Sequence, residues 1–475
     1  MLFNSWSFLL FFPLVTAVYF LLPHRFRWIH LLAASALFYA AFIPAYLLIL
    51  AFTIGVDYFA GIWIEQAQGR KRKMFLLFSI VANVGTLAVF KYYNFFIENA
   101  NGLLEWLGYP VDWSLWNIIL PVGLSFHTFQ AMSYTIEVYR GKQKAERHPG
   151  IYALYVMFYP QLVAGPIERP QNLLPQFRRE HTFSSQRLAD GLRLMLWGLF
   201  KKVVIADRLA VYVNAVYADP QDAHYLNLLL ATFFFAIQIY CDFSGYSDMA
   251  IGAAKTMGFD LMTNFRRPYF AAGIAEFWSR WHISLSTWFK DYLYIPLGGN
   301  RLGKARTMLN LAIVFLVSGF WHGAKWTFVI WGAVHAFLLI SASLFKEKKQ
   351  EQPQAKQLVS IGWTFLLVCF AWIFFRAGSL ADAKIILHHI FTMHEGAGFS
   401  AVVTEPVGRL EFGFTSLLIA LLAMLILFRV ELRNKPDMEL IGKKPAADFV
   451  FETGLLLIVL LFGVFNQTSF IYFQF

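Results

Sequence analysis

The chain of 475 residues is 58% hydrophobic and 18% aromatic, well above the apolar share of about 45–50% that is usual for soluble domains. Its formal net charge is +11, but the basic residues cluster in short connections between apolar stretches, which is typical of the positive-inside signal. The composition excludes an ordinary soluble enzyme, and the distribution of the basic residues does not indicate nucleic-acid binding. They predict an all-α polytopic membrane protein.

A long apolar run, residues 2–22, opens the chain. No Lys or Arg precedes it, and Arg25 and Arg27 follow it. This charge order is opposite to that of a cleavable signal peptide. We therefore expect the run to be retained as a membrane helix with its N-terminus outside.

Further apolar segments follow along the chain. Because a spanning helix needs about 20 apolar residues, the sequence predicts about 11–12 transmembrane helices, near 2–22, 28–43, 45–65, 74–97, 117–139, 192–217, 228–253, 308–323, 326–345, 358–375, 412–430 and 449–466. Two apolar stretches interrupted by proline, 152–175 and 265–306, fit no simple span. They are expected to be re-entrant elements, since irregular backbone at membrane depth must be covered by protein or line a cavity.

The connections between these segments differ in charge. Basic residues gather in some of them, at 70–73, 140–147, 346–356 and 429–444, whereas 98–116 and 218–227 carry acidic residues and no Lys or Arg. The basic side is expected to be cytoplasmic. Both termini are then outside, and the chain is one membrane-embedded domain, 1–475, with an exoplasmic tail at 467–475.

His322 lies between two apolar stretches, in the run Ser-Gly-Phe-Trp-His-Gly-Ala. An ionisable side chain at membrane depth is a functional candidate. The neighbouring Gly319, Gly323 and Ala324 are expected to leave space beside the ring, as a substrate tunnel requires. A buried histidine that hydrogen-bonds a neighbouring helix is the alternative.

A second histidine, His282, lies in an equally aromatic segment with Arg280 and Lys290 close by in sequence. Two such histidines suggest one buried site. The alternative is that His282 only organises a loop.

Three acidic residues, Asp57, Asp242 and Asp248, also lie in apolar stretches. A buried carboxylate is costly unless it is paired. A structural pairing with Lys or Arg and a catalytic role both remain open from the sequence.

No metal site is expected. His388, His389 and His394 lie close together in a predicted outer loop, but no acid or Cys completes a zinc-binding pattern, so we interpret them as surface histidines. Cys241 and Cys369 are the only cysteines and cannot build a cysteine-based site.

Several motifs together resemble those of the membrane-bound O-acyltransferase family, and within it the bacterial branch that acetylates exported polysaccharides. The motifs are PVGLSFHTFQAMSY at 121–134, FWSRWHISLSTWFKDYLYIPLGGNR at 277–301, GFWHGA at 319–324 and FIYFQF at 470–475. The resemblance implies a helical bundle around a central tunnel. It also implies that His322 is the catalytic histidine and His282 the second one.

The resemblance further implies acetyl-CoA as the donor, which is anionic and cytoplasmic. Basic residues near the His282 segment are then the expected contacts to the donor: Arg280, Lys290, Arg301, Lys304 and Arg306. Phosphate groups would be attracted to them by charge.

The acceptor implied by the resemblance is an exported polysaccharide such as alginate or peptidoglycan, outside a bacterial cytoplasmic (inner) membrane. An exported SGNH-type partner is expected to complete the transfer. The aromatic tail is similar to the tyrosine motif of small acyl-accepting proteins, and this similarity suggests Tyr472 as an acetyl relay. An interfacial aromatic anchor in the membrane lipid is the alternative for the tail.

Two other functions stay open from the sequence. D-Alanyl transfer to teichoic acid uses the same family architecture. A transporter for lipid-linked sugars would also need broken helices around a central polar site.

Overall fold

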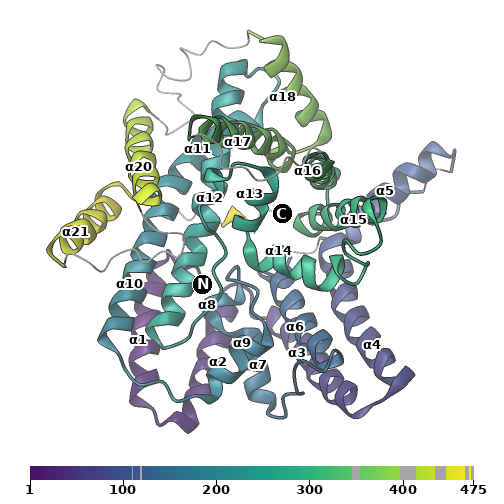
Figure 1. Ribbon diagram of the computed structural model, residues 1–475, viewed down its shortest axis with the longest axis vertical. Coiled ribbons are helices and arrows are strands. Elements are labelled where there is room, and N and C mark those ends of the chain that lie inside the picture. The colour runs from purple at the N-terminus through teal and green to yellow at the C-terminus, as the bar shows by residue number, and fades with distance from the viewer. Residues whose placement is uncertain are drawn as a thin grey trace. The chain divides into compact units, whose positions relative to one another are not determined.

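The computed structural model describes residues 1–109, 111–117, 120–344, 354–395, 413–433, 445–465, 470 and 471, with the backbone alone for 445–448. Within these ranges the regular elements are helices, and no strand occurs (Figure 1). The prediction of an all-α protein is confirmed. The chain divides into two compact units, which we call unit 1 (1–192 with 249–262) and unit 2 (193–248 with 263–475).

The predicted membrane segments are helical over most of their lengths. Helices long and apolar enough to cross a membrane, searched over the described residues, are Tyr46–Gln66, Gly69–Trp106, Tyr225–Thr256, Trp326–Leu344, Gln354–Arg376 and Phe414–Arg433, and shorter apolar helices are Trp6–Leu21 and Phe449–Phe462. The chain is therefore a multi-pass membrane protein. The count of 11–12 crossings, the central tunnel and the positions of the termini stay predictions.

Unit 1 is built from the N-terminal helices: α1 (Trp6–Leu21), α2 (His24–Ala40), α3 (Tyr46–Gln66), α4 (Gly69–Leu87), η1 (Ala88–Tyr92), α5 (Tyr93–Trp106), α6 (Leu124–Tyr139), α7 (Pro149–Met157), α8 (Tyr159–Leu162), α9 (Pro170–Arg178) and most of α10 (Ser185–Leu199). Asp57 is buried and accepts hydrogen bonds from Ser79 Oγ (2.5 Å) and Asn83 Nδ2 (2.8 Å). These bonds join α3 to α4 and satisfy the carboxylate, so the structure favours a structural role for Asp57.

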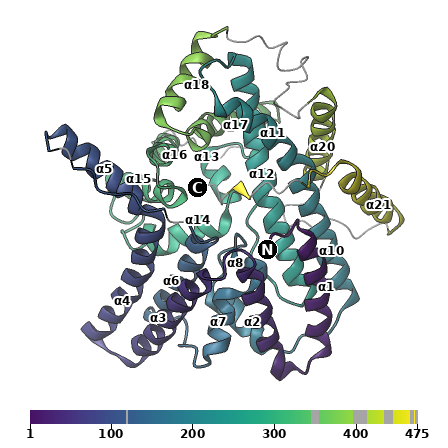
Figure 2. The ribbon, with the colours of Figure 1, turned by 180° about the vertical axis from the view of Figure 1, so that it is seen from behind.

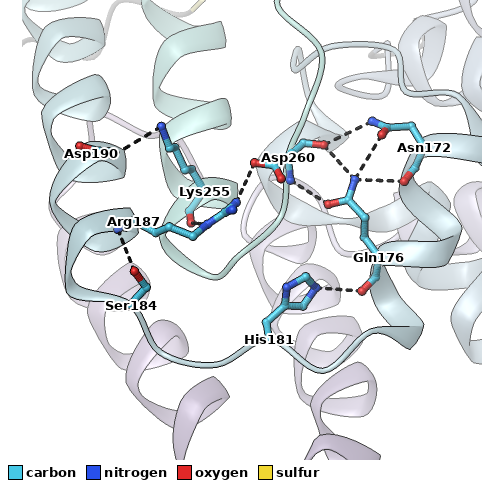
Figure 3. Close-up of polar contacts among 8 residues, drawn as sticks. All are labelled: Asn172, Gln176, His181, Ser184, Arg187, Asp190, Lys255 and Asp260. Atoms are coloured by element: carbon cyan, nitrogen blue, oxygen red, sulfur yellow. Dashed lines mark hydrogen bonds and ion pairs between the residues drawn. The ribbon is translucent and has the colours of Figure 1, made fainter. Parts of the chain in front are cut away.

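One end of unit 1 is held by polar contacts around Asp260, which follows α12 in the chain (Figure 3). Its carboxylate pairs with Arg187 on α10 at 2.7 Å. Its backbone N–H donates to Gln176 Oε1 at 2.8 Å, and its carbonyl accepts from Gln176 Nε2 at 3.0 Å. His181 approaches the Gln176 carbonyl at 2.9 Å. The contacts fix the loop after α12 between α9 and α10.

Unit 2 contains the rest of the helices: η2 (Phe200–Ala206), α11 (Asp207–Ala218), most of α12 (Tyr225–Thr256), η3 (Pro268–Phe270), α13 (Ile274–Arg280), α14 (Ile283–Phe289), η4 (Lys290–Tyr294), α15 (Lys304–His322), α16 (Trp326–Leu344), α17 (Gln354–Arg376), α18 (Leu380–Thr392), α20 (Phe414–Arg433) and α21 (Pro445–Phe462). The end of the described chain lies beside α12 in both ribbon views (Figures 1 and 2).

The α15–α16 hairpin corrects one expectation. A β-carbon built on Gly319 would lie 2.2 Å from the carbonyl oxygen of Phe328, and one on Gly323 would lie 2.2 Å from the Phe328 ring. The space beside these two glycines is therefore filled by Phe328 and is not open. The glycines let α16 pack directly against α15, as small residues do between membrane helices.

Two predicted outer loops are partly helical: in one, an apolar helix continues beyond the run that locates it, and in the other, a separate helix begins after Ser379. α5 extends to Trp106, and α18 carries both His388 and His389. His389 is buried, so its interpretation as a surface histidine is wrong. His394 follows α18, and its ring stacks on that of His389 with centroids 4.1 Å apart.

Candidate active site

Unit 2 brings His282 and His322 together. Their ring centroids lie 6.5 Å apart, and the residues are only 1% and 4% exposed. His282 stands between α13 and α14, and His322 is the last residue of α15. Forty residues of sequence separate the two histidines, so their proximity is a product of tertiary structure.

The backbone at His282 is strained. Its φ of 43° lies in the left-handed region, which a residue with a β-carbon occupies only when the surroundings hold it there. Asn264 provides this support: its carbonyl accepts from Ile283 N–H at 2.9 Å, and its Oδ1 accepts from Ser284 Oγ at 2.6 Å. Asn264 Nδ2 donates to Ser247 Oγ on α12 at 3.1 Å. Asn264 thus ties the backbone that follows His282 to α12, and this fixes the position of the imidazole.

Aromatic rings surround the histidine pair. The ring of His322 lies 5.0 Å from that of Trp331 and 5.4 Å from that of Phe375, in edge-to-face arrangements. Phe243 of α12 packs edge to face on His282 at 4.6 Å. The surroundings restrict both imidazoles to narrow ranges of orientation, which suits groups that must meet a reacting atom.

A third buried histidine was missed by the sequence analysis. His335 on α16 accepts a hydrogen bond at Nδ1 from Trp278 Nε1 at 3.3 Å. Since indole N–H can only donate, the neutral ring carries its proton on Nε2. His335 Nε2, Trp331 Nε1 and Thr327 Oγ1 are all buried and have no hydrogen-bond partner within the described part of the chain. The sequence feature that could have revealed this group is the spacing of four residues between its members, which places them on one face of α16.

The basic residues expected to meet the donor fall into two groups. Arg280 pairs with Glu276 at 2.5 Å. The side chains of Lys290, Arg301, Lys304 and Arg306 are exposed, on η4 and around the start of α15. The structure therefore places Arg280 in a local ion pair, and it leaves the other four accessible to an anion.

The acids of α12 are paired with lysines of η2. Lys201 Nζ lies 2.6 Å from Asp248 Oδ2, and Lys202 Nζ lies 2.6 Å from Asp242 Oδ1 and 2.8 Å from Asp207 Oδ1. Both α12 carboxylates are within 10% exposure at the side chain. The ion pairs favour the structural alternative for these acids.

The remaining site expectations concern the tail and metals. Tyr472 lies outside the described residues. Phe470 and Ile471, directly before it, are buried at 1% and 2% exposure. Among the residues that the structure describes, no group of three or more His, Cys, Asp or Glu side chains is arranged to hold a metal ion.

The chain is similar to proteins named as O-acetylating enzymes and as D-alanyltransferases. It is 40% identical to a probable alginate O-acetylase of Pseudomonas putida over 405 residues, which cover 84% of this chain and 80% of the relative. It is 36% identical to a peptidoglycan O-acetyltransferase of Helicobacter pylori over 386 residues, 75% of this chain and 72% of the relative. Similarity to a teichoic acid D-alanyltransferase of Bacillus subtilis is lower, 27% over 282 residues, 54% of this chain and 69% of that protein.

A family model describes the same relationship. The membrane-bound O-acyltransferase model matches residues 147–380, a range that contains both His282 and His322. Together with the extent of the alginate O-acetylase match, this shows that the chain belongs to the membrane-bound O-acyltransferase family and is a multi-pass membrane acyltransferase.

Proposed function

We propose that the chain transfers acetyl groups from cytoplasmic acetyl-CoA toward an exported polysaccharide, across a bacterial inner membrane in which both termini are outside. The observation that carries the proposal is the buried His282–His322 pair. The higher identity and coverage of the O-acetylating relatives, compared with the D-alanyltransferase, favour acetyl as the group transferred.

Acetyl transfer from a thioester to a hydroxyl group requires mainly a general base and a correctly positioned donor. A thioester carbonyl is already activated, so the enzyme mainly has to deprotonate the attacking hydroxyl and steady the oxyanion. In the proposal, His322 takes the hydroxyl proton, the hydroxyl oxygen attacks the carbonyl carbon, and the CoA thiolate leaves and receives the proton. His282, held by Asn264, orients the donor beside this base.

The start of α15 supports a donor entrance. Arg301, Lys304 and Arg306 gather there and are exposed, although the helix dipole disfavours cations at an N-terminus. These basic residues therefore do not stabilise the helix through its dipole. Contact with the phosphate groups of acetyl-CoA would explain why they gather there. His322 ends the same helix, roughly 27 Å away at 1.5 Å per residue. The helix then links a basic surface to the buried histidines.

Charge reversal at Arg301, Lys304 and Arg306 to Glu is expected to raise the KM for acetyl-CoA, with a smaller effect on kcat, because binding energy common to ground and transition states is lost. The measurement is the rate of CoA release at varied acetyl-CoA. Reversal of the three exposed basic residues Arg70, Lys71 and Lys73 on α4 is the matched control for a general loss of positive charge. An unchanged KM in the triple variant would place the donor entrance elsewhere.

His282→Ala is expected to lower acetyl transfer less than loss of His322 does, because positioning is lost while the base remains. Asn264→Ala should give a similar but smaller decrease, since it removes Oδ1, which accepts from Ser284, and leaves its own carbonyl bond to Ile283. Steady-state transfer rates of the variants test this order. Equal and complete loss in His282→Ala and His322→Ala would instead indicate a two-histidine catalytic pair.

The route to the acceptor is proposed to use Tyr472. Its phenol attacks the acetyl carbonyl, His322 takes the phenol proton, and CoA leaves as the thiol. An exported SGNH-type partner then receives the acetyl group and regenerates the phenol. A phenol with a pKa of about 10 gives an ester more reactive than an alkyl ester, which suits a relay.

Loss of the chain from its host tests the function itself. The acetyl esters of one exported polysaccharide should disappear, while the amount of that polymer and the D-alanyl content of the envelope stay unchanged. Loss of D-alanyl esters would support the D-alanyltransferase alternative. Loss of the whole polymer would support a transporter.

A further inference from the structure

A directed polar contact docks the described residues of the tail, Phe470 and Ile471, within unit 2. The backbone N–H of Ile471 donates to Asp242 Oδ2 at 2.7 Å, in a buried environment. The Phe470 ring packs at 4.8 Å from that of Tyr246 and 5.8 Å from that of Phe243, both on α12. A backbone N–H held by a carboxylate resembles the capture of a peptide ligand more than ordinary side-chain packing.

The carboxylate of Asp242 is also paired and oriented from its other side. Asp242 Oδ1 lies 2.6 Å from Lys202 Nζ, which also pairs with Asp207. The neighbouring Lys201 pairs with Asp248. Each of the two lysines thus has a carboxylate on α12, and Asp242 Oδ2 is the oxygen that faces the tail.

Local backbone geometry makes this arrangement possible. The lysines lie on η2, a π-helical segment that continues α10, and a wider helical turn of this kind often marks a functional position. Gly245 of α12 faces it: a β-carbon there would lie 2.6 Å from the carbonyl oxygen of Gly198. The close approach of the two helices brings both lysines within ion-pair distance of α12.

The docked tail lies next to the candidate active site. Phe243 follows Asp242 in α12, and its ring contacts both Phe470 and His282, at 5.8 Å and 4.6 Å between centroids. One aromatic ring therefore separates the tail from the histidine. In sequence, the residue after Ile471 is Tyr472.

We infer that Asp242 is a positioning residue, which holds the backbone N–H of Ile471 and, in the proposed relay, thereby presents the tyrosine that follows in sequence to the acetyl donor. The tail is then a permanently bound acyl carrier rather than a membrane anchor. The presentation rests on the proposed relay through Tyr472, but the docking does not. Hydrogen bonds to charged groups are among the strong ones in proteins, so loss of this bond has a measurable effect.

Hydrogen–deuterium exchange of the peptide that contains Ile471 tests the docking. Asp242→Ala is expected to speed exchange in this peptide by about tenfold or more, as loss of a charge-assisted hydrogen bond implies. Asp207→Ala is the matched control, because it also removes one carboxylate from Lys202 but leaves Asp242, which accepts from Ile471, in place. Unchanged exchange in Asp242→Ala, or equal acceleration in Asp207→Ala, overturns the inference.

A second pair of variants leaves the ion pairs intact, in case Asp242→Ala does not fold. Ile471→Pro removes the N–H that donates to Asp242 and also fixes φ at this residue, whereas Ile471→Val keeps the N–H with a slightly smaller apolar side chain. Ile471→Pro should lower kcat for acetyl transfer about tenfold with an unchanged KM for acetyl-CoA, and Ile471→Val should match the wild type. Equal rates for Pro and Val overturn the positioning role.

The exchange, the kcat values and the detection of acetyl-Tyr472 together distinguish the positioning role of Asp242 from the proposed relay through Tyr472. If Asp242→Ala speeds exchange, Ile471→Pro lowers kcat and acetyl-Tyr472 forms, both ideas are supported. If exchange is faster and kcat falls but no acetyl-Tyr472 forms at any stage, Asp242 positions the tail for another purpose, and the relay is wrong.

Discussion

His322→Gln is expected to lower acetyl transfer by about 10²- to 10⁴-fold, the range that a general base typically contributes. Glutamine fills much of the space of the imidazole but cannot accept the proton of an attacking hydroxyl. Size matters here because His322 is enclosed by the rings of Trp331 and Phe375 and is 4% exposed. The measurement is the rate of acetyl-ester formation by purified protein at saturating acetyl-CoA.

A matched control separates lost chemistry from lost packing. His389→Gln replaces another buried histidine, on α18, whose ring contacts those of His388 and His394, and should keep the wild-type rate. His322→Gln should keep the size-exclusion profile and melting temperature of the wild type to within a few degrees. A folded His322→Gln variant with near-normal transfer would remove His322 from the role of base.

Tyr472→Phe should abolish delivery of acetyl groups to the polymer, because it keeps the aromatic ring and removes only the hydroxyl that carries the acetyl group in the proposed relay. Release of CoA by hydrolysis should continue at a reduced rate, since water can still reach an intact His322 site. The measurement compares acetyl esters on the polysaccharide with free CoA thiol for the same preparation.

The neighbouring tail aromatics supply the control. Tyr472→Phe and Phe473→Tyr together keep one phenol in the tail but move it by one residue. This double variant should remain inactive if the phenol must stand at 472. Acetylation of polymer at the wild-type rate by Tyr472→Phe alone would leave the tail only an anchoring role.

The sequence predicted the helices well because apolar run length is a strong local signal. The runs near 228–253 and 326–345 became α12 and α16 with small boundary shifts. The end of the predicted segment 74–97 was placed too early, because α5 continues into polar residues to Trp106, and the separate helix α18 was not predicted. The segment 117–139 begins as a helix only at Leu124, after Pro121 and a left-handed Gly123.

The site was predicted only in part, since local sequence patterns do not give the distances between helices. His282 and His322 were chosen as chemically unusual residues, and the structure brings them together. The role of Gly319 and Gly323 was misread because a glycine opens space only if no neighbour fills it, and Phe328 fills it. The strained backbone of His282 and its support by Asn264 also depend on tertiary contacts.

The pairing of buried charges shows the same limit. Lys201 and Lys202 lie inside the predicted segment 192–217 and were not singled out, because the sequence does not show which acids they contact. In the structure they neutralise Asp248 and Asp242, and Asp242 in turn binds the backbone of Ile471. The roles of these buried charged residues could be interpreted only when the structure showed which lysine pairs with which carboxylate.

Incubation of the purified chain with acetyl-CoA labelled in the acetyl group, without polymer or partner protein, tests the central claim most directly. The wild type should release CoA thiol and retain label as an alkali-labile ester on the peptide that contains Tyr472, and His322→Gln should do neither. Acetyl-CoA that stays intact in the presence of the folded wild-type protein would contradict the account.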